Sequence, residues 1–369
     1  MSRNLIVCFD GTNNQFGSHD SNVVRLVQSL ERFGERQIVY YDPGVGTLPE
    51  PGLLTQAAKR ISELFGLAFG VGLVAKIERA YAFLMHTWQP GDRVFLFGFS
   101  RGAYTARALG GLLHMFGLLA PSHENLLPYV MRLFRGSRRI EDQDAQIWRV
   151  AAQFRNTFAR DAGADHRRFR VHFLGVWDTV SSVGWIWDPV KFLHTAANPS
   201  IATVRHAVAI DERRSFFRQN LFADDVRGQN LLELWFPGVH ADVGGGYPES
   251  HGGLWREPFT WMLDEAKKAG LLTDPERERR VLTRTAPPEQ PCAEPQHESL
   301  TWKWWPAEFF PKLRYNKRMG RRLPSLGLGR RRRIEPGAQL HRSVAQRIES
   351  VAGYAPANLP RAESVARQS

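Results

Sequence analysis

Residues 94–103 read VFLFGFSRGA: an apolar run, then one serine between two glycines, then the beginning of an Ala-, Leu- and Arg-rich segment. The apolar run predicts a buried strand, and the segment after it predicts a helix. A G-x-S-x-G pattern at such a junction is typical of a nucleophile elbow, a sharp turn that exposes the serine hydroxyl and points the helix N-terminus at the reacting group. We therefore predict Ser100 as a nucleophile; a structural glycine-rich turn is the alternative.

The rest of the chain repeats the alternation of strand and helix. Further apolar runs predict strands at 4–9, 37–41, 170–177 and 231–236. Helices are expected between and after them, at 23–33, 76–88, 103–119, 200–210 and 259–269. Strands that alternate with helices form a mainly parallel sheet covered by helices on both faces, which places the chain in the α/β class.

The composition changes along the chain and suggests three regions. Residues 1–274 hold all the predicted strands and are expected to form the catalytic domain. Within them, 120–168 is charged and helical and is expected to be an inserted cap. From 275 the sequence becomes rich in Pro, Arg and Glu, with a short tryptophan cluster. We expect this basic C-terminal extension (275–369) to wrap the core or to extend as a partly disordered tail.

The chain is basic, with a formal net charge of +12 over 369 residues. Much of the excess lies in Arg321-Arg322 and in the arginine run 330–333. A basic surface suits anionic lipid or nucleic acid, or merely solubility. No recognised nucleic-acid module surrounds the run, so we expect a solvated or lipid-facing patch, with an anionic membrane surface rather than nucleic acid as the partner.

Motifs for cofactors, metals and disulfides are missing from the sequence. It has no G-x-x-x-x-G-K-[ST] loop, no dinucleotide fingerprint and no zinc-spaced Cys/His cluster, so neither a cofactor nor a metal is expected. The two cysteines, Cys8 and Cys292, make no disulfide framework. The chain opens almost directly on a predicted strand, so we expect no Sec signal peptide and, if the protein is exported, another route.

Three polar residues follow three different predicted strands: Ser100, Asp178 and His240. The carboxyl ends of parallel strands meet at one edge of a sheet, where reactive groups gather. A serine hydroxyl is a weak nucleophile, so a histidine must take its proton, and a carboxylate must hold that imidazole in the correct tautomer. The order Ser, Asp, His along the chain is that of the α/β-hydrolase triad.

Other residues could fill two of these roles. His251 is the second choice of base, whereas His206, predicted on a helix, is expected to be a core or capping residue. Asp211 and Asp188 compete with Asp178 for the role of the acid. Asp178 is preferred because it ends an apolar strand.

The oxyanion that develops during acyl transfer needs two or more preorganised N–H donors. Arg101, directly after the serine, supplies the first through its backbone N–H. The loop Asp10-Gly11-Thr12 after the first strand is the candidate for the second, through the Gly11 or Thr12 N–H; alternatively, Asp10 only caps that turn. Asp242 follows the histidine closely and is expected to brace its loop rather than to bind a cation.

Four motifs resemble those of one α/β-hydrolase family, which contains the Tle1-like phospholipase effectors of bacterial type VI secretion. They are FDGTNN at 9–14, GFSRGA at 98–103, VWDTV at 176–180 and FPGVHADVGGGY at 236–247. The resemblance covers about residues 4–270. It implies Ser100 as nucleophile, Asp178 as triad acid and His240 as base, and phospholipase A-type ester hydrolysis for the effector members.

These observations predict a serine hydrolase that cleaves carboxylic esters, with the acyl ester of a glycerophospholipid as the favoured substrate. A soluble-ester esterase is the alternative among enzymes. A non-catalytic protein that binds membranes or partners through its basic tail is the alternative outside them. The resemblance also implies type VI export with a secretion or immunity partner. Effector members are often longer, with a substantial C-terminal membrane-binding module, from which the short extension of this chain differs.

Overall fold

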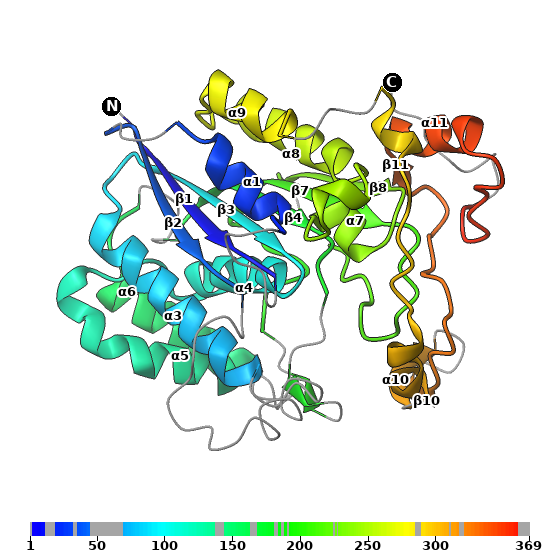
Figure 1. The fold of residues 1–369 in the computed structure, drawn as a ribbon. Helices are drawn as coiled ribbons and strands as arrows, with labels where there is room; N and C mark the ends of the chain where they lie inside the picture. The colour runs from blue at the N-terminus through cyan, green and yellow to red at the C-terminus, as the bar shows by residue number, and fades with distance from the viewer. Residues whose placement is uncertain are drawn as a thin grey trace, which may run out of the picture.

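The computed structural model describes most of the chain. The described residues are 2–11, 19–31, 35–44, 69–136, 144–162, 168–180, 184–185, 188–189, 192–223, 226, 228–284, 289–309, 311–316 and 321–360. A seven-stranded sheet runs through the centre of this structure (Figure 1). Within the described part of the chain, no helix is long and apolar enough to cross a membrane.

The sheet has the order β11-β8-β7-β4-β3-β1-β2, and every neighbouring pair is parallel. Its strands are β1 (Asn4–Phe9), β2 (Gln37–Asp42), β3 (Arg93–Phe99), β4 (Val171–Trp177), β7 (Ile201–Ala209), β8 (Asn230–Phe236) and β11 (Gln339–Leu340). After β1 the chain adds β2 on one side, and then adds β3, β4, β7 and β8 on the other. The carboxyl ends of β1 and β3 therefore flank the topological switch point, where open α/β sheets bind ligands.

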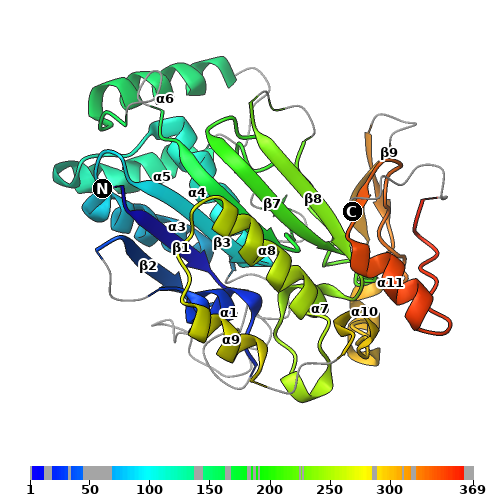
Figure 2. The same cartoon turned by 90° about the horizontal axis from the view of Figure 1, so that it is seen from above.

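Helices cover both faces of the sheet (Figures 1 and 2). One face carries α1 (Asn22–Ser29), α8 (Arg256–Lys268) and α9 (Pro275–Leu282), and the other carries α3 (Phe69–Thr87), α4 (Arg101–Phe116), α5 (Leu127–Gly136) and α6 (Asp144–Phe158). β1 contributes to both cores, because Leu5 and Val7 pack on the α4 side while Ile6 and Cys8 pack on the α1 side. This burial on two faces explains the continuous apolar run. The predicted α/β class is confirmed.

The helices expected within 120–168 are present in the described part of that region. The 3-10 helix η1 (Pro121–Leu126) leads into α5, and α6 follows. η1 and α5 pack against α3, and α6 packs against α4. These helices thicken the α4 side of the sheet (Figure 2).

The helix predicted at 200–210 is wrong, because strand β7 lies there. Ile201, Val204 and Val208 recur every three or four residues, which is also the period of a helix face. β7 lies between β4 and β8, so both of its faces can be apolar and no alternation marks it as a strand. The β-branched side chains fit such a strand well.

The chain after α9 returns to the sheet. It forms η4 (Pro291–Ala293), η5 (Trp302–Trp304), α10 (Trp305–Glu308), the hairpin of β9 (Lys312–Asn316) and β10 (Arg321–Ser325), and finally β11 and α11 (Arg342–Ser350). β11 pairs with β8 and extends the sheet by one strand. Ile334 and Val344 pack with Val208 and Trp235 in a third, smaller core. β11, α11 and the residues of this third core therefore lie against the sheet, whereas β9 and β10 form a separate two-stranded hairpin.

Candidate active site

Ser100 lies in the turn between β3 and α4 and adopts φ 59° and ψ −120°. Residues other than glycine rarely adopt a positive φ, so this turn is strained. The two glycines of the motif allow the backbones to approach closely. A Cβ on Gly98 would lie 2.5 Å from the Gly102 carbonyl oxygen, and a Cβ on Gly102 would lie 2.2 Å from the Phe9 carbonyl oxygen. α4 can thus begin directly against the end of β1, with Ser100 at the carboxyl edge of the sheet.

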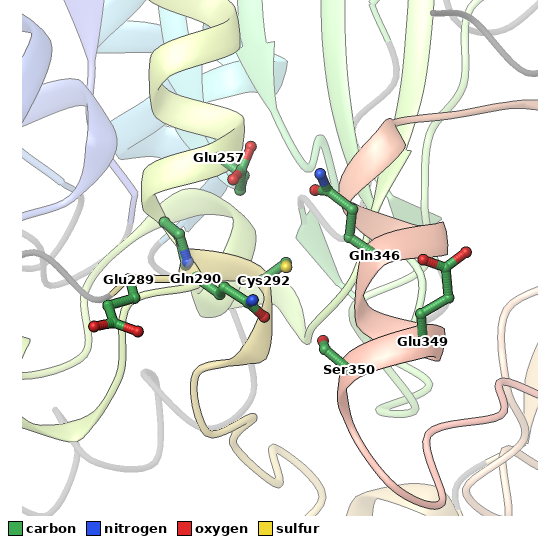
Figure 3. A pocket seen from close by; sticks show the side chains of 8 residues that line it. Glu257, Glu289, Gln290, Cys292, Gln346, Glu349 and Ser350 are labelled. Carbon is green, nitrogen blue, oxygen red and sulfur yellow. The ribbon is translucent and has the colours of Figure 1, made fainter.

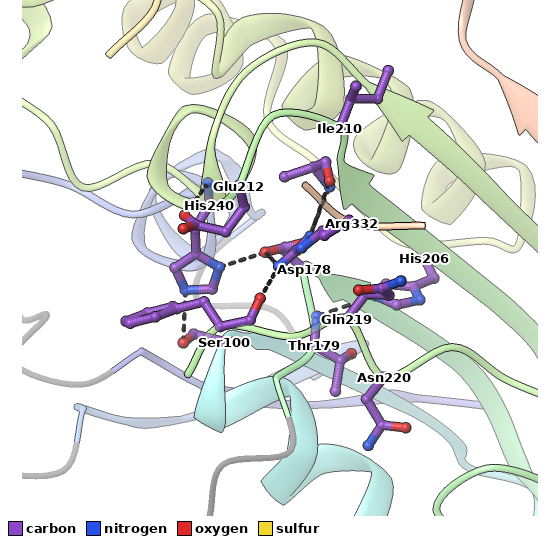
Figure 4. Close-up of polar contacts among 12 residues, drawn as sticks. Ser100, Asp178, Thr179, His206, Ile210, Glu212, Gln219, Asn220, His240 and Arg332 are labelled. Atoms are coloured by element: carbon purple, nitrogen blue, oxygen red, sulfur yellow. Dashed lines mark hydrogen bonds and ion pairs between the residues drawn. The ribbon is translucent and has the colours of Figure 1, made fainter. Parts of the chain in front are cut away.

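Asp178 and His240 also lie at this edge. Asp178 follows β4, and His240 begins the short helix α7 (His240–Gly244) after β8. The His240 Nδ1 lies 2.5 Å from the Asp178 Oδ2, and its Nε2 lies 2.8 Å from the Ser100 Oγ (Figure 4). All three residues are buried. The structure therefore brings the three predicted residues into one continuous chain of hydrogen bonds.

This arrangement is suited to nucleophilic catalysis with proton transfer. The His240 Nε2 is within hydrogen-bonding distance of the hydroxyl whose proton a base must remove. Because Asp178 faces Nδ1, it favours the tautomer that carries a lone pair on Nε2. Burial lowers the pKa of His240 below its ordinary value, although the hydrogen bond to Asp178 acts in the opposite direction. The lowered pKa favours the neutral imidazole, which is the form that acts as a base.

Aromatic rings and an ion pair surround the His240 imidazole. The rings of Phe99 and Phe217 lie 4.7 and 4.8 Å from it, centroid to centroid. The Glu212 Oε2 accepts a bond from the His240 backbone N–H at 3.2 Å and lies 2.9 Å from the Arg214 Nη2. Burial acts to raise the pKa of Glu212, but Arg214 lowers it to about 2. These contacts hold both the ring and the backbone of His240.

One member of the arginine run 330–333 lies inside this site. The expectation of a solvated or lipid-facing patch is wrong for Arg332, whose side chain is 3% exposed. Its Nη1 lies 2.5 Å from the Asp178 Oδ1, and its Nη2 lies 2.9 Å from the Asp178 Oδ2. Burial acts to raise the pKa of Asp178, but the attraction to Arg332 and the hydrogen bond from His240 hold that pKa well below its ordinary value. Asp178 is therefore ionised at neutral pH.

The loop predicted to supply the second oxyanion donor is described only in part. The Gly11 N–H donates to the Asp10 Oδ1 at 2.7 Å, so this N–H already has an acceptor in the structure. The Asp10 Oδ2 accepts from the Ser21 Oγ and the Tyr41 hydroxyl, both at 2.8 Å. Asp10 thus caps the turn and ties it to α1 and β2. Thr12 lies outside the described residues.

Arg101 occupies the position expected of the first oxyanion donor. It is the first residue of α4 and directly follows Ser100. Arg101 is half-buried, and desolvation lowers the pKa of its guanidinium to about 9. The backbone N–H of this residue remains the predicted donor, because the N-terminus of a helix favours negative charge.

The alternative histidines have other places in the fold. His206 lies in β7, where its Nε2 accepts the Thr179 N–H at 3.1 Å and its Nδ1 lies 2.7 Å from the Glu233 Oε1. It therefore supports the loop that follows Asp178. His251 is an exposed residue of the 3-10 helix η3 (Glu249–His251).

The alternative acids are likewise placed elsewhere. The Asp211 Oδ2 accepts the Gly238 N–H at 2.8 Å and the Tyr354 hydroxyl at 2.9 Å, which links the loops after β7 and β8 to the C-terminal segment. Asp188 belongs to strand β6 (Asp188–Pro189), which pairs with β5 (Gly184–Trp185) in a separate ribbon. It is Asp178 that contacts His240.

Asp242 braces the loop that carries His240. Its Oδ2 accepts the Val239 N–H at 3.0 Å, and its Oδ1 lies 2.6 Å from the His297 Nδ1. The His297 ring stacks on Tyr247 with centroids 3.6 Å apart. In the part of the chain that the structure describes, no group of three or more His, Cys, Asp or Glu side chains could hold a metal ion.

A surface pocket lies between α8, η4 and α11 (Figure 3). Its lining includes Glu257, Cys292, Gln346 and Ser350. Burial raises the pKa of Glu257 and of Cys292. The lining does not include the predicted site residues, so this pocket is not assigned to the reaction.

The chain is similar to a known protein family and to a curated protein. The model described as "T6SS, Phospholipase effector Tle1-like, catalytic domain" matches residues 3–265. The uncharacterized protein YEL023C of Saccharomyces cerevisiae is 34% identical over 229 residues, which make up 60% of this chain and 33% of that protein. The chain thus matches about a third of the length of this relative.

Solved structures are similar at lower identity. An uncharacterized protein from Pseudomonas aeruginosa is 21% identical, with 78% of this chain and 49% of that chain covered and a TM-score of 0.45. The Tle1 effector bound to the VgrG spike of the type VI secretion system is 21% identical over 67% of this chain and 51% of that one, with a TM-score of 0.37. Acyl-protein thioesterase 2 of Zea mays is 11% identical, with 73% of this chain and 95% of that chain covered and a TM-score of 0.33.

The family model spans more than half of the chain, and its range includes Ser100, Asp178 and His240 but ends before Arg332. The architecture agrees with it: a mainly parallel sheet lies between helices, as in an α/β hydrolase, with a serine at the turn from β3 to α4. The chain therefore belongs to the Tle1-like catalytic domains of type VI secretion phospholipase effectors, a family of hydrolases.

Proposed function

We propose that the protein is a serine hydrolase of carboxylic esters and that its substrate is the acyl ester of a glycerophospholipid, as for a phospholipase A. The observation that carries this proposal is the hydrogen-bonded chain from Ser100 through His240 to Asp178. In this reaction Ser100 is the nucleophile and His240 is the general base and then the general acid. Asp178 orients the imidazole and stabilises its cation.

The reaction proceeds in two stages. The Ser100 Oγ attacks the ester carbonyl while the His240 Nε2 takes its proton, which then passes to the leaving alcohol. The backbone N–H groups of Arg101 and Thr12 bind the oxyanion; loss of one such donor costs about 10²–10³ in kcat in a comparable enzyme. Water, deprotonated by His240, then attacks the acyl-enzyme, releases the fatty acid and regenerates Ser100.

An exposed apolar surface near the site supports a lipid substrate. Trp302, Trp305, Phe309, Leu326 and Leu328 have between 38% and 78% of their surface exposed, and we call this set the aromatic edge. The two segments that carry these residues are joined by a hydrogen bond between the backbones of 327 and 308. Clustered apolar side chains at a surface mark interaction sites, and tryptophan is typical of the membrane–water interface.

The aromatic edge is connected to the site by packed rings. Trp304, within the same turn, packs its ring edge-on against Phe217 at 5.5 Å, and Phe217 packs against His240 at 4.8 Å. Arg214 lies over Phe217 at 3.6 Å from the ring centroid. The hairpin of β9 and β10 that follows is rich in arginine. We infer that this side of the molecule meets an anionic membrane surface.

A soluble-ester esterase would use the same three residues, and the aromatic edge is the observation that favours the lipid substrate over it. Membership of a type VI effector family supports the further proposal of export by that route, with a secretion or immunity partner. The structure of the Tle1 effector with the VgrG spike provides an example of such a partner for that protein.

The test compares wild type with Ser100→Ala on a short-chain nitrophenyl ester and on mixed phospholipid vesicles. Ser122→Ala is the matched control, because Ser122 is exposed in η1. We expect Ser100→Ala to lose both activities by about 10⁴-fold or more and Ser122→Ala to keep them. Full activity in Ser100→Ala would contradict the proposal. Activity of the wild type on the soluble ester alone would favour the esterase.

A further inference from the structure

The Arg332 guanidinium makes four hydrogen bonds within the candidate active site (Figure 4). Two of them form a paired contact with the Asp178 carboxylate, from Nη1 to Oδ1 and from Nη2 to Oδ2. The other two bonds go to the carbonyl oxygens of Ala209 at 3.0 Å and Phe217 at 2.5 Å. All four N–H groups on Nη1 and Nη2 are therefore used, in the planar geometry that matches a carboxylate.

The same guanidinium joins the acid to the surroundings of the base. Ala209 ends β7, and its own N–H donates to the Asp178 Oδ1 at 2.9 Å. Phe217 packs its ring against His240. Each Asp178 oxygen thus accepts two bonds, and only one of these four comes from His240. Arg332 limits the rotation of the carboxylate that would break the bond to His240.

Arg332 comes from the part of the chain that follows the range of the family model, which ends at residue 265. Its backbone is fixed there, because the Asn358 side chain donates to the carbonyl oxygens of Arg332 and Ile210 at 3.1 and 3.0 Å. The side chain of its neighbour Arg333 points outward: it is 73% exposed and contacts Glu335. The inward position of Arg332 is therefore specific to one residue of the run.

The charge of Arg332 acts on a small group of ionisable side chains. Asp178 faces Arg332 and His240, and His240 also faces Arg214 and Glu212. Without Arg332, the pKa of the buried Asp178 carboxyl would rise, because no cation would stabilise its charge. Where Asp178 stayed charged, the pKa of His240 would rise instead, because the carboxylate would stabilise the imidazolium more strongly. The active state has an ionised Asp178 and a neutral His240. Both effects would cause this state to gain a proton, and so to lose activity, at a higher pH than in the wild type.

We propose that Arg332 is a positioning residue for the hydrolysis: it fixes the Asp178 carboxylate toward His240 and keeps it charged, so the C-terminal segment completes the active site. The proposal rests on the proposed function, since it assigns a role within the same triad. It also makes the segment around 332 part of the catalytic unit rather than an addition to it.

The test uses full-length Arg332→Gln, Arg332→Lys and, as the matched control, Arg333→Gln. kcat and KM on the soluble nitrophenyl ester are measured as functions of pH. For Arg332→Gln we expect a lower kcat with little change in KM. The acidic limb of its kcat–pH profile should shift to higher pH by about one unit or more. Arg332→Lys keeps the charge but not the paired bonds, so its limb should stay near that of the wild type while kcat recovers in part. Arg333→Gln should match the wild type.

Two results would overturn the proposal. One is a wild-type kcat in Arg332→Gln. The other is a loss of kcat that is equal at every pH, with the limb unmoved, because that is what a purely structural role predicts. If Arg332→Gln does not fold by circular dichroism, the rate at which a fluorophosphonate labels Ser100 decides the question in Arg332→Lys. Labelling several-fold slower than in Arg333→Gln supports the proposal, and an equal rate contradicts it.

The wild-type protein separates this inference from the proposed function. If the wild type hydrolyses the ester and Ser100 is labelled, but the Arg332 variants behave as the wild type does, only the role of Arg332 is refuted. If the wild type hydrolyses no ester and Ser100 is not labelled, the serine hydrolase itself is refuted and the role of Arg332 with it.

Discussion

At the scale of single residues, Asp178 has two partners that make opposite demands on it. The carboxylate must orient His240 and stabilise its cation, which requires a full negative charge directed at Nδ1. Arg332 partly neutralises that charge, but it also prevents the buried carboxyl group from taking up a proton. As a result, Asp178 is held in place and ionised, while the pKa of the adjacent His240 lies below its ordinary value.

The pH dependence of catalysis follows from the pKa of His240. Burial lowers this pKa below 6.5, with Asp178 opposing the shift and Arg214 adding to it. Hydrolysis needs the neutral imidazole, so kcat/KM at pH 6.5 should still exceed half of its plateau value and should fall to half only as the pH drops through the lowered pKa. The measurement is kcat/KM on the soluble ester against pH, with circular dichroism to confirm folding at each pH. A half-maximal value at or above pH 6.5 would contradict this prediction.

The sequence allowed three site residues to be predicted but not Arg332. Ser100, Asp178 and His240 each follow an apolar run, and the carboxyl ends of parallel strands share one edge. Arg332 is separated from Asp178 by 154 positions and lies in a run of four arginines that look alike in the sequence. Only the path of the chain after β10 decides which of the four points inward.

At the scale of elements, the junction of β3 and α4 was predictable and the outer strands were not. The elbow has a local signature, because its close backbone contacts need glycine. The sequence of β7 resembles that of a helix, because apolar residues on a strand buried on both faces lack a period of two. β11 has only two residues, so no pattern could reveal it, and it exists through its pairing with β8.

Gly102→Ala should disrupt the elbow. The new Cβ would lie 2.2 Å from the Phe9 carbonyl oxygen and 2.5 Å from that of Asp10, and backbone atoms cannot move aside easily. We expect the free energy of unfolding to fall by about 1–3 kcal/mol and kcat to fall further, as α4 and Ser100 shift away from β1. Urea unfolding and ester hydrolysis provide the two measurements.

Gly110→Ala is the control for that substitution, because Gly110 lies in the same helix. Its new Cβ would meet the end of the Ile201 side chain at 3.2 Å, and a flexible side chain can yield. Alanine also favours a helix over glycine by about 1 kcal/mol. Stability and kcat near those of the wild type are expected here. Equal losses in the two variants would show that the clash at the elbow is not the cause.

At the scale of the whole molecule, the C-terminal segment joins catalysis to the surface. It supplies Arg332 to the acid, β11 to the sheet and the aromatic edge, which Trp304 and Phe217 connect to His240. Glu308 connects these parts, since its buried carboxylate accepts the N–H groups of Ser215 and Gly329 at 2.6 and 3.1 Å. Through Glu308, the segment that carries the aromatic edge is hydrogen-bonded to the loop that carries Phe217. A membrane bound at the aromatic edge would therefore contact a segment that is tied to the surroundings of His240.

The aromatic edge can be tested separately from the chemistry with the double substitution Trp302→Ser and Phe309→Ser. These residues are 78% and 59% exposed, so their loss should leave folding and soluble-ester hydrolysis unchanged. Each large apolar side chain that enters a lipid interface contributes about 1.5–3 kcal/mol, so hydrolysis of anionic vesicles and cosedimentation with them should fall by about tenfold or more. Ile348→Ser is the control, because Ile348 is 44% exposed on α11, far from α10 in Figure 1. Unchanged vesicle hydrolysis in the double variant would show that the lipid surface is bound elsewhere.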